Sequence, residues 1–214
     1  KQQLPPEPEQ RGERRFLLKR EAQVPFAMMG FRVPNYSSED SYALDILESI
    51  LSRGKSSRLY QSLVYEQKNA LAVGAEYSLM QTDPSLFYFY ALVSPGQKVD
   101  AVEDGLHREI ARLQNEPPSE IELQRAKNQV EAARVFEQDS NFRHAMLLGQ
   151  AETIGAGWRH VDQFLDRIRA VTAKDVQRVA KQYLTPDNRT VGILVPLPSK
   201  QAEPVPTAAQ HGKS

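Results

Sequence analysis

One run of nine residues constrains the fold more than any other part of the chain. Residues Leu86–Ser94 read L-F-Y-F-Y-A-L-V-S, with apolar or aromatic side chains at odd and even positions alike. Side chains alternate between the two faces of a strand, so this composition is typical of a strand buried on both faces. The turn residues Gln81–Pro84 connect it to a second run, Leu71–Leu79, which predicts an antiparallel hairpin. We therefore expect residues 86–94 to lie centrally in a sheet, covered above and below.

Further strands and helices are indicated on both sides of this hairpin. β-Branched and aromatic runs predict strands at Arg15–Leu18, at Val24–Val33 and at 190–196. Start signals and apolar residues at helical spacing predict helices between these strands, one of them running from a capping box at Ser119–Glu122 towards Gln150. This order predicts an α+β fold, an antiparallel or mixed β-sheet packed against paired helices as a two-layer sandwich.

The same order sets the expected domain boundaries. Residues 1–12 are proline-rich and polar, which is typical of a linker or tail. Residues 13–197 contain all the predicted strands and helices and form the domain, and residues 198–214 have the composition of a disordered tail. The chain begins at Lys1 instead of Met, so we expect a processed product or a piece of a longer protein.

Composition excludes several classes of function. The formal net charge is zero, which gives no global electrostatic argument for a nucleic-acid or anionic-membrane partner. The chain has no cysteine, which rules out disulfides and thiolate metal sites. No apolar run approaches the roughly 20 residues of a membrane span. We therefore expect no nucleic acid as a partner and no membrane span.

Candidate binding residues occur in the stretch Gly54–Gln67, which reads as a single helix. At about 100° per residue, the apolar side chains from Leu59 to Val64 form one stripe. Arg58 and Tyr65 fall together on the opposite, polar face, only about 20° apart and with Cα atoms roughly 10 Å apart. A guanidinium and a phenol so placed form a pair of hydrogen-bond donors aimed the same way. The alternative is that Arg58 caps or bridges locally and Tyr65 is a half-buried rim residue.

Other catalytic motifs are absent or incomplete. Gly54-Lys55-Ser56 lacks the earlier glycine of a phosphate-binding loop, and no G-x-S-x-G, H-E-x-x-H or H-x-x-E-H occurs. No histidine has another within four residues, so we expect each to be structural or solvated. The four are His107, His144, His160 and His211. We interpret the carboxylates of the long helix, at positions 120, 122, 131 and 137, as a solvated, salt-bridged face.

Four segments together resemble the pitrilysin family of zinc metallopeptidases, which includes insulysin and the mitochondrial processing peptidases. They are G-K-S-S-R-L-Y-Q-S-L-V-Y at 54–65, the hairpin with S-P-G at 94–96, P-S-E-I-E-L-Q-R-A-K at 118–127, and the closing segment 171–191. The similarity covers roughly residues 13–197 and is to the C-terminal half, which carries no zinc.

The resemblance implies a function that this chain performs with a partner. In the family, two halves close around a peptide or small unfolded protein, and one half carries H-x-x-E-H. The other half contributes an arginine and a tyrosine seven residues apart, which Arg58 and Tyr65 match in identity and spacing. The resemblance implies that Arg58 binds a backbone carbonyl of the substrate. It implies that the Tyr65 hydroxyl donates to the scissile carbonyl as an oxyanion donor. It places zinc in the homologous partner half, on the same longer chain or a separate subunit, with no cofactor bound by this chain.

Two other functions stay open. Members of the same family serve as structural core proteins of respiratory complexes, so a non-catalytic assembly subunit of the same fold is the main alternative. A free-standing peptide-binding domain ranks last, because half of such an enclosure offers a substrate only one wall. The compartment is not fixed by the residues, and the bacterial periplasm is the location that the resemblance favours.

Overall fold

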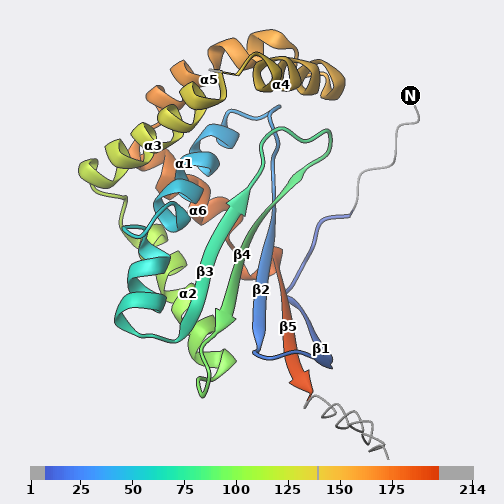
Figure 1. Ribbon diagram of the computed structural model, residues 1–214, viewed down its shortest axis with the longest axis vertical. Helices are drawn as coiled ribbons and strands as arrows, with labels where there is room; N and C mark the ends of the chain where they lie inside the picture. Colours follow the sequence, from blue (N-terminus) through green and yellow to red (C-terminus); the bar gives the residue numbers. More distant parts are fainter. Residues whose placement is uncertain (1–7, 139, 198–214) are drawn as a thin grey trace, which may run out of the picture.

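The computed structural model describes residues 8–138 and 140–197, without the side chains of residues 137 and 138. Its sheet has five strands in the order β1-β5-β2-β4-β3 (Figure 1). Strand β1 pairs in parallel with β5, and the other neighbours are antiparallel. This mixed sheet confirms the predicted α+β class. The strands are β1 (Arg14–Glu21), β2 (Phe26–Val33), β3 (Ala70–Tyr77), β4 (Ser85–Val93) and β5 (Arg189–Leu197).

The helices of the described part of the chain pack on one face of this sheet, and none of them covers its other face (Figure 1). The α-helices are α1 (Asp40–Ser52), α2 (Val99–Asn115), α3 (Glu120–Gln138), α4 (Asn141–Ile154), α5 (Trp158–Ala170) and α6 (Ala173–Tyr183). A π-helical segment, η1, spans Tyr60–Glu66, and a short 3-10 turn, η2, spans Pro186–Asn188. The core lies between the sheet and α1, α2 and α6, where Phe31, Phe87 and Leu44 are fully or almost fully buried. None of the helices described is long and apolar enough to cross a membrane.

Strand β4 lies inside the sheet, between β2 and β3, but the prediction that both its faces are covered is wrong. Phe87 and Phe89 are buried against the helices, whereas Leu86, on the other face, is 54% exposed. On the uncovered face, the ring of Tyr90 packs sideways over Gly74 of the neighbouring strand β3. A Cβ atom at Gly74 would lie only 2.6 Å from the ring of Tyr90. The apolar composition of β4 therefore reflects cross-strand packing on the uncovered face as well as a helical cover on the other.

The long helix predicted from residue 119 towards Gln150 is divided into α3 and α4. Ser140 is the N-cap of α4, and its hydroxyl accepts a hydrogen bond from the backbone N–H of Arg143. A hydroxyl cap of this kind satisfies a backbone donor that the first turn of a helix leaves free. The cap therefore favours a new helix start, which the continuous helical composition does not reveal.

The expected linker and tail are described only in part. Residues 8–13 have no regular secondary structure, and Gln10 donates a 2.7 Å hydrogen bond to the carbonyl of Arg189 at the start of β5. Residues 1–7 of the predicted linker and the whole predicted tail, 198–214, lie outside the described residues. The extent of the domain therefore stays a prediction.

Candidate functional site: a buried arginine and an exposed tyrosine on one helix

The segment that carries Arg58 and Tyr65 is helical only in its second half. Residues 54–56 form an exposed turn in which Gly54 has a φ of +82°, and helical structure begins at Arg58 instead of Gly54. The backbone N–H of Gln61 bonds the carbonyl of Ser57 four residues earlier, whereas that of Gln67 bonds Ser62 five residues earlier. The helix thus changes from α to π, a form that is rare and frequent at functional sites.

The wider π turn separates the two candidate side chains. As predicted, Leu59 and Leu63 are buried in the core. Arg58 is only 8% exposed, while Tyr65 is 67% exposed. The shared polar face expected from a regular α-helix is therefore not formed, because the angle between residues seven apart changes when one turn takes up more residues. The site consists of a buried guanidinium and a phenol at the surface of the same helix.

Arg58 is held by a carboxylate at the start of α3. Its Nε donates to Oε1 of Glu122 at 2.9 Å, and its Nη2 donates to Oε2 at 3.0 Å. Paired hydrogen bonds of this kind are the strongest form of the arginine–carboxylate interaction. The hydrogen bond from Arg58 is the main cause that lowers the pKa of Glu122 to about 2. Glu122 is therefore ionised at neutral pH and fixes the plane of the guanidinium.

One nitrogen of Arg58 stays without a partner. Nη1 is buried and makes no hydrogen bond to any of the described residues. The phenol of Tyr65 also makes no hydrogen bond within the described part of the chain. Unlike Nη1, it lies at the surface. The arrangement thus provides two unused hydrogen-bond donors, one shielded and one exposed.

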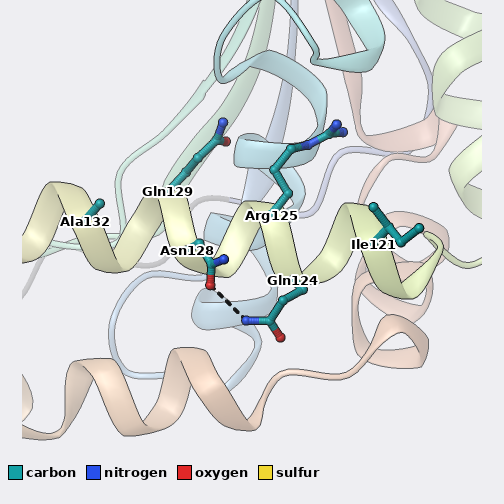
Figure 2. Close-up of a pocket in the computed structure, with 6 residues that line it drawn as sticks. All are labelled: Ile121, Gln124, Arg125, Asn128, Gln129 and Ala132. Atoms are coloured by element: carbon teal, nitrogen blue, oxygen red, sulfur yellow. Dashed lines mark hydrogen bonds between the residues drawn. The ribbon is translucent and has the colours of Figure 1, made fainter.

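A shallow hollow lies along α3, the helix that also carries Glu122 (Figure 2). At one end of it Ile121, the residue before Glu122, is 80% exposed. Arg125 donates a 3.3 Å hydrogen bond to the carbonyl of Ser56, so α3 also holds the exposed turn before Arg58. The residues that line the hollow are Ile121, Gln124, Arg125, Asn128, Gln129 and Ala132.

The histidines and carboxylates in the described part of the chain form no metal site. Within residues 8–138 and 140–197, no group of three or more His, Asp or Glu side chains is arranged to hold an ion. Burial lowers the pKa of both His107 and His160, and Nδ1 of His160 lies 3.3 Å from the hydroxyl of Tyr42. These are the surroundings of structural histidines, and the described residues do not fit a zinc ion.

Glu122 is the site residue that sequence reasoning missed. The sequence interpretation makes it one member of a solvated, salt-bridged face, and Glu131 does pair with Arg169 near the surface. Glu122 instead reaches Arg58, which lies 64 residues earlier in the sequence. The S-x-x-E pattern at Ser119–Glu122 signals a capping box, which the structure contains, but no local pattern reveals the arginine.

Comparisons with known proteins identify relatives of the whole domain. Residues 1–130 match the family model described as the peptidase M16 inactive domain. An uncharacterized zinc protease of Mycobacterium leprae is 27% identical over 188 residues, which cover 87% of this chain and 41% of that protein. The chain therefore spans less than half the length of this curated relative.

Solved structures share the fold. The inactive peptidase domain of a protein named as a zinc protease from Bordetella parapertussis superposes with a TM-score of 0.77 at 30% identity. That match covers 88% of this chain and 99% of the other. A protease from Helicobacter pylori gives a TM-score of 0.82 at 24% identity, over 88% of this chain and 45% of the other, and supports the fold alone.

Proposed function

This chain belongs to the family of M16 inactive peptidase domains, and from that premise we propose that it is the zinc-free half of a zinc-dependent metalloendopeptidase. In this proposal, Arg58 and Tyr65 serve substrate binding and oxyanion stabilisation in the hydrolysis of a peptide or small unfolded protein. The observation that carries the proposal is the pair of unused donors on one helix, with Arg58 two residues before the π-helical segment and Tyr65 within it and 67% exposed.

Tyr65 has the properties of an oxyanion donor. Its hydroxyl is exposed and makes no hydrogen bond to the described residues, so it is available to a carbonyl oxygen that approaches from outside. A donor aimed at the scissile carbonyl stabilises the negative charge that develops there in the transition state. In this proposal, Tyr65 therefore acts on a peptide bond that is held by the partner half and faces this surface.

Arg58 has the properties of a binding residue. A guanidinium is permanently charged, and Glu122 fixes the orientation of this one by two hydrogen bonds. Nη1 then offers a donor to a backbone carbonyl of the peptide. Contacts with the peptide backbone carry little information about side chains, so this arrangement favours a broad range of sequences.

Metal and attacking water come from a homologous partner half in this proposal. A catalytic zinc ion polarises the scissile carbonyl and lowers the pKa of a bound water. The described residues hold no group suited to such an ion. The partner half is either another part of the same longer protein or a separate subunit.

The test is a Tyr65→Phe substitution in the full assembly of this chain with its zinc-bearing half, assayed with a fluorogenic peptide. Removing one oxyanion donor typically lowers turnover about a hundred- to a thousandfold, and we expect a fall of that size in kcat. Tyr60→Phe is the matched control, because Tyr60 lies on the same helix and is partly buried. If both variants turn over at the unsubstituted rate, Tyr65 has no part in the mechanism, and a purely structural subunit becomes the better interpretation.

A further inference from the structure

We propose that Glu122 is the positioning residue of the Arg58 site: it binds one edge of the guanidinium and thereby reserves Nη1 for a substrate carbonyl. This inference rests on the proposed function and adds a residue to it. It also connects the peptide site to the N-terminus of α3, which lies far from Arg58 in the sequence.

The geometry of the pair leaves one nitrogen of the guanidinium for a substrate carbonyl. Glu122 occupies Nε and Nη2, the two nitrogens on one edge of the guanidinium. Nη1 projects from the remaining corner and is the only nitrogen of the group without a partner among the described residues. Because the guanidinium is planar and rigid, fixing one edge also fixes the position of that corner.

Glu122 is itself held firmly. Its Oε2 accepts a 3.1 Å hydrogen bond from the backbone N–H of Ser119 and a 3.0 Å hydrogen bond from the Ser119 hydroxyl. In return, the Ser119 hydroxyl accepts from the backbone N–H of Glu122 at 3.3 Å. The carboxylate is therefore part of the capping box of α3. The first turn of that helix thus fixes the carboxylate to which Arg58 donates its two hydrogen bonds.

Burial distinguishes this pair from the surface ion pairs of the chain. The side chain of Arg58 is 7% exposed, against 45% for Arg167 and 54% for Arg169, which pair with Glu39 and Glu131. Surface pairs contribute little and leave their unused nitrogens to water. A buried charged donor without an acceptor is costly, and such groups call for an explanation.

A peptide carbonyl is an acceptor of the required kind. Because Nη1 is shielded from solvent, the carbonyl must displace the groups that cover it, and the hydrogen bond then forms in a dry environment where it is strong. The same acceptor removes the cost of the unpaired donor. Pairing this donor therefore adds to the free energy of peptide binding.

The test separates the two roles of Glu122 in the full assembly with its zinc-bearing half. In Glu122→Gln, glutamine still suits a capping box but cannot accept hydrogen bonds from two nitrogens of a guanidinium with both its terminal atoms. Glu120→Gln is the matched control, because Glu120 lies in the same helical turn and is exposed. We expect Glu122→Gln to raise KM about tenfold with kcat changed less than about twofold, the effect of misplacing one charge-assisted hydrogen bond. Glu120→Gln should leave KM unchanged.

A double-mutant cycle shows whether Glu122 acts through Arg58. In an Arg58→Ala background, Glu122→Gln should not raise KM further, since the group that it positions is gone. If the two substitutions raise KM independently, so that their effects multiply in the double variant, the positioning role is overturned. A lower KM in Glu122→Gln alone also overturns it, because the pair would then restrain Arg58 instead of positioning it. If Arg58→Ala leaves KM unchanged, the proposed function of Arg58 fails instead, so the two failures are distinguishable.

Discussion

The Arg58–Glu122 pair predicts a measurable dependence of stability on pH in this chain by itself. The pKa of Glu122 is lowered from an ordinary value of 4.5 to about 2, mainly by the hydrogen bond from Arg58. A carboxyl whose pKa is depressed by folding stabilises the folded state fully above its unfolded pKa. This contribution is therefore complete above about pH 4.5 and is lost as the pH falls towards 2.

The magnitude follows from the same values. At about 1.4 kcal/mol for each tenfold change in proton affinity, a lowering from 4.5 to about 2 corresponds to an upper bound of about 3 kcal/mol. The Glu122 side chain is 22% exposed, so solvent screens part of the interaction. We therefore expect about 1–2 kcal/mol in the free energy of unfolding at neutral pH.

The assay is urea unfolding of the unsubstituted chain, Glu122→Gln and Glu120→Gln at pH 7, 3.5 and 2.5. Glu120 is the matched control, because it lies in the same helical turn and is exposed. The difference between the unsubstituted chain and Glu122→Gln should be largest at pH 7 and should shrink steadily towards pH 2.5. A difference that stays constant across this range, or that Glu120→Gln reproduces, would refute the assignment of the low pKa to the pair with Arg58.

Two predictions concern the sheet. Phe89→Ala removes a fully buried side chain of β4 and should lower the free energy of unfolding by about 3–5 kcal/mol, measured by urea unfolding; a cost near that of an exposed position would contradict the one-sided core. Gly74→Val introduces a Cβ atom that would lie 2.6 Å from the outer end of the Tyr90 ring, which must move aside, so by the same measurement the free energy of unfolding should fall by less than the roughly 1–3 kcal/mol that overpacking a closed core costs. Adding Tyr90→Ala should recover part of that loss, and the absence of any recovery would show that the ring is not the cause.

The sequence predicts those features whose causes are local. The capping box of α6, formed by Thr172 and Asp175, is visible in the sequence as a start signal and is present in full. The β3–β4 hairpin follows from two apolar runs around a turn, and its antiparallel pairing is confirmed. In each case, neighbouring residues supply both the structural preference and the hydrogen bonds that satisfy it.

The features that sequence reasoning missed depend on residues far apart. The uncovered face of the sheet looks apolar in the sequence because Tyr90 and Phe16 pack across strands onto Gly74 and Gly192, although Phe16 stays 58% exposed. The partner of Arg58 lies at the start of α3, and a pattern within residues 54–67 cannot contain it. Strand pairing determines the first feature and helix packing the second. Neither can be derived from a local sequence pattern.

The π-helical turn connects these observations to function. In a regular α-helix, Arg58 and Tyr65 would project from one face and share one environment. Arg58, in the α-helical start, instead reaches inwards to Glu122, and the wider turn that follows leaves the phenol of Tyr65 in solvent. A donor fixed within the protein suits the binding of a peptide backbone, whereas a donor at the surface can meet a reaction centre held by another polypeptide segment. The irregular helix thus supplies a buried environment for the proposed binding residue, Arg58, and an exposed one for the proposed oxyanion donor, Tyr65.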